Sequence, residues 1–398
     1  MRIGLPLIKH YKDRQILSAN IVVETAGVDC PKSFWFATTA DEVPFLPDMA
    51  DAFVVGLIAS AMYLGEDIWV EGMVSTRLAN GLDTYQNVLS TWWPGIFKTV
   101  GIHYEGLVER HEDLRPGGVG CTFSGGLDSY HAVLQLLPAQ VKYPGFSITH
   151  ALMINGFDQI SDLDRRGIAQ HMYSIYQSTL KEWDVNLLMV DTNLRSFRRA
   201  ILERREQVHS YSSALATCAH ALGGLFGRFG ISGHATYAYN QLEPDGSHPA
   251  LDHHLSSDQL QIFHTGTIHS RSRKTEILAE FPNVRENLRV CFGDLSFDRQ
   301  TRMPVNCCEC EKCVRTMVAL IIIGKLDQFP TFSKRRAPLT SYRNPDVLRS
   351  IDDHHLKDMM ELARRHAQDE WVEILDAARV RRRVMEDEAQ KSNVTEPS

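Results

Sequence analysis

The sequence lacks the long apolar segments that membrane-spanning proteins need. Its longest mostly apolar stretch, residues 52–64, is shorter than the roughly 20 residues that cross a bilayer as a helix. The first residues, MRIGLPLIKHYKDRQ, contain charges but not the apolar core of a secretory signal peptide. We therefore expect a cytoplasmic protein that does not act at a membrane.

An excess of positive charge is also missing. The formal net charge is -7, which gives no general attraction to nucleic acid and argues against a dedicated nucleic-acid binder. The chain has no G-x-x-x-x-G-K-[ST] string, which disfavours the usual P-loop kinases and GTPases. It also has no G-x-S-x-G elbow, which disfavours a serine hydrolase. Arg2 follows the first methionine, whereas a glutaminase of the asparagine-synthetase type would need a cysteine there as its nucleophile.

The cysteines are too few and too unevenly placed for a disulfide scaffold. Cys30, Cys121 and Cys218 lie among apolar neighbours and are expected to be buried core residues. The other five lie in one region. Within it, Cys307, Cys310 and Cys313 have C-x-x-C-x-x-C spacing, and Cys291 lies sixteen residues upstream.

Four thiolates with this spacing predict a closed Cys₄ site around one tetrahedral ion. We expect zinc in a structural role, and an iron–sulfur cluster is the alternative. Cys308 is then the spare cysteine. The stretch between Cys291 and Cys307 would act as a loop that returns the chain to the metal.

The pattern along the chain favours an α/β fold with a doubly wound parallel sheet. Strand-like and helix-like runs alternate from residue 119 to residue 232. Residues 1–115 are expected to form a small α/β domain of unknown role, with strands at 16–23, 33–38 and 67–74 and a helix at 49–64. Residues 116–330 form the main domain. Residues 331–398 form a helical extension whose last residues, 388–398, are disordered.

The central feature is the turn SGGLDS, residues 124–129, between a strand and a helix. Its glycines permit close backbone approach, and its serines add hydroxyl donors where a helix begins, so the turn suits a phosphate group. Asp128 would repel a bare phosphate, which suggests a Mg²⁺ ion that bridges carboxylate and phosphates. The turn therefore predicts a nucleoside triphosphate.

SGGLDS resembles the pyrophosphate-loop signature S-G-G-x-D-S of the N-type ATP pyrophosphatases, whose fold is of the adenine nucleotide alpha hydrolase type. Together with the four cysteines, it resembles the 7-cyano-7-deazaguanine synthase family over residues 118 to about 325. The chain departs from that family in its extra N-terminal region, in the larger spacing of Cys291 and in having Cys308 where the family has glycine. These departures fit a divergent subgroup, such as those associated with antiviral defence.

The resemblance also implies site residues. It implies ATP binding by Ser124, Gly125, Gly126, Leu127, Asp128 and Ser129, and by Asp158 in the segment GFDQ. Asp191 is a further predicted ATP-binding residue because it lies at a strand end. KTEI resembles a K-x-E-I segment whose lysine, here Lys274, approaches the phosphates, and Arg271 lies one turn earlier. These two residues and Asp128 are the predicted catalytic groups. A solvated helix start is the alternative for residues 271–277.

The long stretch between residues 237 and 270 has no periodicity and is expected to be a functional loop. Ser247, His248 and Asp252 from this loop, with Arg195 after the third strand, are the predicted substrate-binding residues. The arginines between 195 and 205 could instead form a solvated helix face.

The resulting hypothesis is an ATP-dependent carbon–nitrogen ligase that uses ATP, Mg²⁺ and Zn²⁺. It would adenylate a small-molecule carboxylate, 7-carboxy-7-deazaguanine by the resemblance, release pyrophosphate, and pass the acyl group to ammonia or an amine. The product would be an amide or a nitrile, and in a defence-type protein a protein amine could be the acceptor. The alternatives are RNA-base thiolation and a non-catalytic ATP sensor. The chain is expected to form a homo-oligomer.

Overall fold

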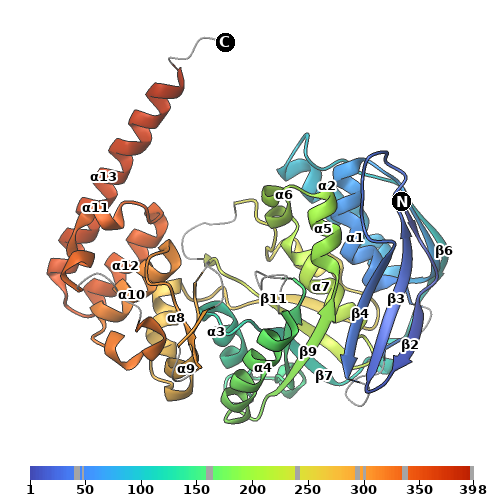
Figure 1. The fold of residues 1–398 in the computed structure, drawn as a ribbon, viewed down its shortest axis with the longest axis horizontal. Coiled ribbons are helices and arrows are strands. Elements are labelled where there is room, and N and C mark those ends of the chain that lie inside the picture. The colour runs from blue at the N-terminus through green and yellow to red at the C-terminus, as the bar shows by residue number, and fades with distance from the viewer. Residues whose placement is uncertain are drawn as a thin grey trace. The chain divides into compact units, whose positions relative to one another are not determined.

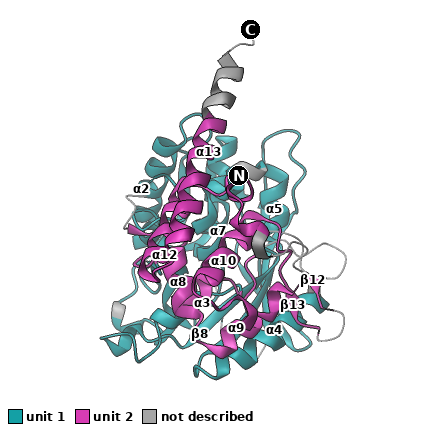
Figure 2. Cartoon of the chain, turned by 90° about the vertical axis from the view of Figure 1, so that its left-hand side faces the viewer, with its two compact units in different colours: residues 1–124, 132–233, 242–266 teal, residues 125–131, 234–241, 267–398 magenta. Residues whose placement is uncertain are grey.

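The computed structural model describes residues 1–39, 45–46, 49–157, 165–237, 243–291, 296–298, 302–333 and 339–394. Contacts divide the chain into two compact units (Figure 2). Unit 1 consists of Met1–Ser124, Ala132–Gly233 and Leu242–Gly266, and unit 2 consists of Gly125–His131, His234–Gln241 and Thr267–Ser398.

Unit 1 is built on an eleven-stranded sheet with the order β11-β10-β7-β8-β9-β4-β3-β1-β5-β6, and β2 pairs with β3 (Figure 1). The sheet is mostly parallel, so the α/β class predicted from the sequence is confirmed. Its strands are β1 (Arg2–Ile3), β2 (Leu7–Tyr11), β3 (Arg14–Val22), β4 (Ser33–Thr39), β5 (Ile68–Ser75), β6 (Ile102–Val108), β7 (Gly118–Thr122), β8 (His150–Asn155), β9 (Asn186–Thr192), β10 (Phe226–Ser232) and β11 (Gln261–Thr265).

Strands β7 to β11 are parallel neighbours, and their order places the first of them, β7, between β8 and β10. In this parallel part of the sheet the strand order reverses after β9, because β10 lies on the other side of β7. Ligands of such sheets bind at the carboxyl ends of the strands where the order reverses. Here that point lies between β7 and β10, and β7 ends directly before the glycine-rich turn.

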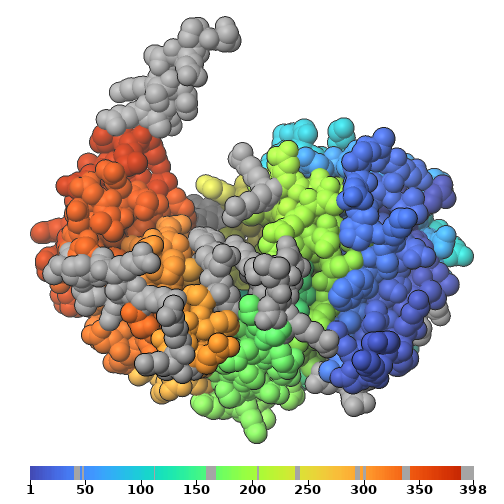
Figure 3. All heavy atoms as spheres, viewed as in Figure 1, coloured from blue at the N-terminus to red at the C-terminus, as the bar shows by residue number. Residues whose placement is uncertain are grey.

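Residues 1–115 contribute β1 to β6 to the large sheet. Strand β4 pairs antiparallel with β9, so the N-terminal strands continue the sheet that contains β7 to β11. Figure 3 shows the blue N-terminal atoms directly against the green atoms of this region. The aromatic rings of Phe34, Phe36, Phe53 and Phe197 pack together across this junction. The N-terminal residues therefore share one apolar core with residues of β8, β9 and β10.

The sequence predicted one of the first two helices of unit 1 and missed the other. The predicted helix at 49–64 is α1, which is buried on nearly all sides and ends at Gly65 in the left-handed conformation. The next helix, α2, was not predicted, although Leu78, Leu82 and Leu89 form its buried face. The helices are α1 (Asp51–Leu64), α2 (Thr76–Trp92), α3 (Leu127–Gln135, which begins in unit 2), α4 (Arg165–Lys181), α5 (Leu194–Ile201), α6 (Arg204–His209) and α7 (Tyr211–Ala221).

Two local predictions need correction. The stretch 237–270, expected to be a loop without regular structure, contains β11, which pairs with β10 over five residue pairs. Residues 388–394, expected to be disordered, belong to the last helix, α13.

Unit 2 is mainly helical and carries the cysteine cluster. Its helices are α8 (Arg271–Leu278), α9 (Pro282–Asn287), α10 (Glu311–Ile322), α11 (Pro345–Leu348), α12 (Asp353–Arg365) and α13 (Asp369–Val394). A short antiparallel hairpin, β12 (Ser296–Phe297) and β13 (Pro304–Val305), precedes α10. The predicted helical character of the C-terminal extension is therefore present.

Candidate functional site

The glycine-rich turn has the strand-before, helix-after setting that the sequence predicts. Gly125 has a φ of 70°, in the left-handed region that glycine adopts without strain. The Ser129 hydroxyl donates to the Gly126 carbonyl at 3.0 Å, and the Leu127 side chain is buried, so only the backbone of Leu127 is available to a ligand. Ser124 is exposed and ends the first segment of unit 1. ATP binding by this turn stays a prediction.

The three predicted catalytic residues meet within unit 2. Lys274 Nζ lies 3.0 Å from Asp128 Oδ1, and Arg271 Nη2 lies 2.6 Å from Asp128 Oδ2. Arg271 and Lys274 lie in the first turn of α8, three residues apart, and therefore on one face of the helix. The Lys274 side chain is fully buried and the other two are mostly buried. The alternative of a solvated helix start is therefore wrong for Lys274.

Charge holds this group of residues together. Burial opposes ionisation of Asp128, but the charges of Arg271 and Lys274 outweigh burial and hold its pKa well below the usual range. Burial lowers the pKa of Lys274, while the Asp128 carboxylate acts in the opposite direction. Both carboxylate oxygens already have a cationic partner. Asp128 is therefore poorly suited to hold Mg²⁺ in this arrangement, and the magnesium assignment stays a prediction.

Several polar groups near this cluster were not found from the sequence. His131 Nε2 lies 2.9 Å from His269 Nδ1, and burial, followed by the charges of Lys274 and His269, lowers the pKa of His131 to about 3. A pocket of unit 2 is lined by Arg271 from α8, Arg315 from α10 and His355 from α12. No motif connects these histidines and Arg315 to the turn, so only the fold brings them together.

Helix α8 is held at both ends by α12. Asp358 accepts a hydrogen bond from the Ser272 N–H at 2.8 Å and another from the Ser270 hydroxyl. Ser270 is also the N-cap of α8. Near the other end, Nε2 of His366, the residue that caps the C-terminus of α12, lies 2.7 Å from Glu276 Oε1. The direction of α8, and with it the positions of Arg271 and Lys274, therefore depends on the C-terminal extension.

The four predicted metal ligands lie together in unit 2. The sulfur atoms of Cys291, Cys307, Cys310 and Cys313 are all within 4.8 Å of one another. Three of the sulfur pairs are 3.4, 3.8 and 3.9 Å apart, whereas a tetrahedral zinc site with Zn–S bonds of about 2.3 Å has sulfurs about 3.8 Å apart. The cluster could hold a metal such as zinc, and the residues fit that ion.

Backbone geometry around the cluster also suits thiolates. The N–H groups of Glu309 and Cys310 donate to Cys307 Sγ at 3.5 and 3.3 Å. Cys310 is the N-cap of α10 and Cys313 lies in its first turn, where the helix dipole favours negative charge. Cys308 points away, and its thiol donates to the Asn306 carbonyl at 3.5 Å. It is the spare cysteine that the sequence predicts.

Asn306 joins the two parts of the cysteine cluster and was missed from the sequence. Its Oδ1 accepts from the N–H groups of Val290 and Cys291 at 2.9 and 3.2 Å, and its Nδ2 donates to the Leu288 carbonyl at 3.0 Å. The residue is fully buried. It fixes the loop of Cys291 beside Cys307 at the end of the β12–β13 hairpin.

Of the two remaining predicted ATP-binding residues, the structure describes Asp191 but not Asp158. Asp191 is buried in unit 1, where Arg14 Nη2 pairs with its Oδ2 and Asn155 Nδ2 donates to its Oδ1 at 2.7 Å. It therefore links β3, β8 and β9. Asp158 lies outside the described residues.

The predicted substrate residues lie in unit 1, and three of them bond to one another. Asp252 is fully buried and accepts from the Ser247 hydroxyl and the His248 N–H, both at 2.9 Å. His264 Nδ1 lies 2.7 Å from Asp252. This network organises the loop itself. It gives no support for substrate contact, which stays a prediction.

The arginines between residues 195 and 205 differ in their exposure to solvent. Arg195, the fourth predicted substrate residue, lies partly exposed near the start of α5. Arg198 is buried and donates to the Ser210 carbonyl at 3.2 Å and to the Gln207 carbonyl, so it joins α5 to α6. The solvated-face alternative is therefore wrong for Arg198.

Searches of protein-family models, curated proteins and solved structures find no match to this chain. The resemblance to pyrophosphate-loop enzymes therefore stays a prediction that depends on the turn and the cysteines. Among the described residues, no helix has the length and apolar character needed to cross a bilayer.

Proposed function

We propose that the protein is an ATP-dependent ligase that activates a carboxylate as its adenylate and transfers the acyl group to a nitrogen nucleophile. The observation that carries this proposal is the contact of Asp128, in the glycine-rich turn, with Arg271 and Lys274 from α8. Two cations from a segment more than 140 residues away are held at the start of the helix that follows this turn. Cations and N–H groups at such a place suit a departing pyrophosphate.

In the proposed reaction, a carboxylate oxygen of the substrate attacks the α-phosphorus of ATP. The bond from that phosphorus to the bridging oxygen breaks, and pyrophosphate leaves with the electron pair. Arg271 and Lys274 would neutralise its charge, and Asp128 would keep both cations in place. Ammonia or an amine then attacks the acyl carbon, AMP leaves, and one proton is released to give the amide.

The cysteine cluster has a structural role in this proposal. A bound zinc ion would cross-link the Cys291 loop, the Cys307 loop and the start of α10, and so would contribute folding energy to unit 2. Four cysteine ligands would leave no open coordination position for substrate.

The proposal is tested with the full chain, ATP, a magnesium salt, 7-carboxy-7-deazaguanine and ammonium. We expect pyrophosphate and AMP in equal amounts, and a product whose mass matches an amide or a nitrile. Lys274→Met should lower the rate of pyrophosphate release by a factor of 100 or more, because one lost charge-stabilising donor at a reacting group costs about 10²–10³ in rate. Lys325→Met, which removes a lysine paired with a mostly exposed Glu280, is the matched control.

The outcomes separate the rival functions. ATP binding without pyrophosphate release would favour a sensor, and release only with added RNA would favour base modification. No ATP uptake by calorimetry, or equal rates for Lys274→Met and wild type, would contradict the proposal. Labelling of a co-expressed protein would point to a protein amine as the acceptor.

A further inference from the structure

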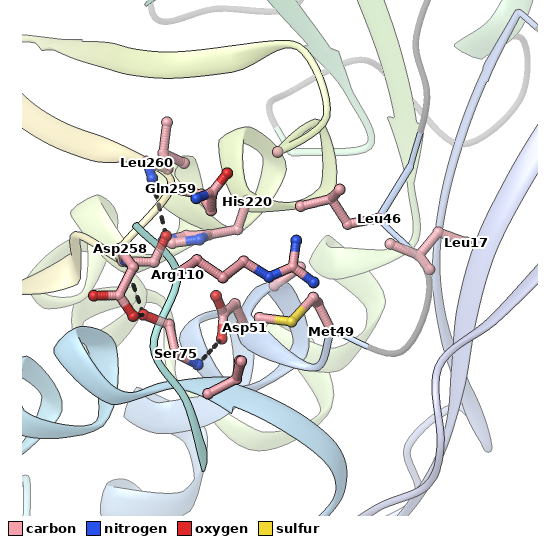
Figure 4. Close-up of a pocket in the computed structure, with 14 residues that line it drawn as sticks. Leu17, Leu46, Met49, Asp51, Ser75, Arg110, His220, Asp258, Gln259 and Leu260 are labelled. Carbon is pink, nitrogen blue, oxygen red and sulfur yellow. Dashed lines mark hydrogen bonds between the residues drawn. The ribbon is translucent and has the colours of Figure 1, made fainter. Parts of the chain in front are cut away.

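Buried polar side chains usually have hydrogen-bond partners. In the pocket of unit 1 drawn in Figure 4, for example, the Ser75 N–H donates to Asp51 at 2.9 Å and the Ser75 hydroxyl donates to Asp258 at 2.7 Å. His131, in the part of α3 that belongs to unit 2, is an exception. It is 1% exposed, and among the described residues none lies at hydrogen-bond distance from its Nδ1. This unpartnered nitrogen limits where the ring can carry its proton.

The other ring nitrogen of His131 bonds to His269. His131 Nε2 lies 2.9 Å from His269 Nδ1, and the two rings meet edge to face. His131 follows Asp128 by three residues and so lies on the same face of α3, while His269 precedes Arg271 by two residues. The histidine pair therefore joins the same two segments as the contact between Asp128 and Arg271. It is a second link between α3 and the start of α8.

Both rings of the pair are uncharged at neutral pH. Burial, followed by the charges of Lys274 and His269, lowers the pKa of His131 to about 3, while Asp128 acts in the other direction. Burial, Arg273 and Lys274 also lower the pKa of His269. A neutral imidazole has one N–H group and one bare nitrogen. In this pair, one ring must therefore donate and the other must accept.

Burial decides which ring donates. If His269 donated from Nδ1, His131 would carry its proton on its own Nδ1, where no acceptor lies among the described residues. A buried donor without a partner costs about 1–3 kcal/mol, and unpaired buried N–H groups are rarer than unpaired acceptors. If His131 donates from Nε2, only a bare nitrogen is left without a partner. His269 then accepts at Nδ1 and carries its own proton on Nε2.

The Nε2–H of His269 is available to a ligand. His269 is partly exposed, unlike His131, and the preceding Ile268 is 64% exposed. Within the described part of the chain, no residue forms a hydrogen bond with His269 Nε2. The charge of Lys274 acts on this ring. The pair therefore places an uncharged donor close to a cation that we propose for pyrophosphate.

We propose that His131 is a positioning residue that keeps the proton of His269 on Nε2, and that this N–H donates to a pyrophosphate oxygen beside Arg271 and Lys274. The second part rests on the proposed function, whereas the first part does not. A phosphate oxygen fits because it is negatively charged and accepts hydrogen bonds. A metal ion fits less well, because the two cations would repel it and His269 has no bare nitrogen left to ligate it.

The first test measures the ring protons directly. Long-range ¹H–¹⁵N spectra of the full chain at pH 7.5 distinguish bare from protonated ring nitrogens, and His131→Gln and His269→Gln assign the signals. We expect a bare Nδ1 and a protonated Nε2 in both rings. His131→Gln keeps a donor and should preserve this state of His269, whereas His131→Leu should allow some Nδ1–H to appear. A protonated Nδ1 on His269 in wild type would overturn the positioning role.

The second test measures binding of inorganic pyrophosphate to the full chain by calorimetry. His269→Phe removes the donor and should weaken binding by about 10- to 100-fold, the range for a hydrogen bond to a charged group. His269→Gln places an amide N–H near the position of Nε2 and should retain most of the affinity. His10→Phe changes an exposed histidine of β2 and is the matched control.

The outcomes distinguish this proposal from the ligase proposal. Equal affinity of His269→Phe and wild type would refute the contact with pyrophosphate and leave the ligase proposal intact. An equal loss in His269→Gln and His269→Phe would also refute it, since the ring would then matter for the fold and not as a donor. No binding by wild type would refute both the contact and the phosphate site of the ligase. The spectra test the positioning role in every case.

Discussion

At the scale of single residues, His220 connects burial with the pH dependence of folding. Its ring lies in α7, 7% of the residue is exposed, and Nε2 lies 2.7 Å from the Leu255 carbonyl, so a proton on Nε2 can be donated there. Burial lowers the pKa of His220 from 6.5 to about 4, although the bond to Leu255 acts in the other direction. Between these values the unfolded chain binds more protons than the folded chain. Stability therefore rises with pH in this window.

We predict that the contribution of neutral His220 is complete above about pH 6.5 and is lost as the pH falls toward 4. At about 1.4 kcal/mol per pKa unit, the largest loss is about 3 kcal/mol. His220→Gln keeps a donor for Leu255 but cannot titrate. Urea unfolding at pH 4.5 and 7.5 should show a smaller difference in unfolding free energy for this variant than for wild type.

The exposed His10 on β2 supplies the control, since His10→Gln is the same substitution at a histidine that is not buried. If His220→Gln and His10→Gln show the same pH difference, burial of His220 does not set the pH dependence.

At the scale of elements, the structure assigns a purpose to the contact between α8 and α12. The first turn of α8 carries Arg271 and Lys274, and Asp358 of α12 bonds to the two residues that flank Arg271. We predict that Asp358→Ala lets this turn fray, because loss of such a cap costs about 0.5–2 kcal/mol. The buried Lys274 ammonium should then become accessible to an acylating reagent.

Mass spectrometry of acetylated Lys274 measures this effect without any assumption about activity. Asp353→Ala is the control, since Asp353 lies on the same helix but pairs with Arg379 of α13. Asp358→Asn keeps an acceptor and should label more slowly than Asp358→Ala. Equal labelling of Asp358→Ala and Asp353→Ala would show that α8 keeps its start without Asp358. If Lys274 labels faster but pyrophosphate is not formed even by wild type, the ligase proposal fails and the positioning role stands.

The sequence predicted elements and site residues where the signal is local. Asp128, Arg271 and Lys274 lie within short motifs, and three of the four clustered cysteines are three residues apart, so their grouping was visible. Asp358, Asn306 and Arg14 could not be found this way, because each acts on a partner that only the fold brings near. Strand β11 was missed because the stretch around it is polar and aperiodic, and pairing with β10, not its own composition, makes it a strand.

At the scale of the whole molecule, the two units depend on different sources of stability. Unit 1 has a large apolar core on its sheet, which includes the joined N-terminal strands. Unit 2 brings together three chain segments and carries the four cysteines. A structural metal contributes directly to folding where its ligands come from separate loops. Metal loss should therefore affect unit 2 far more than unit 1.

Two neighbouring cysteines provide the sharpest test of this difference. Cys310→Ser removes a ligand, so we expect loss of bound zinc by elemental analysis and loss of hydrogen-exchange protection in α9 and α10, while β7 to β9 stay protected. Cys308→Ser changes a buried thiol that bonds to the Asn306 carbonyl instead of facing the cluster, so zinc content should remain near that of wild type. Equal zinc loss in both variants would contradict the ligand set. Iron in place of zinc, with visible absorbance that bleaches on reduction, would assign the cluster to iron and sulfur.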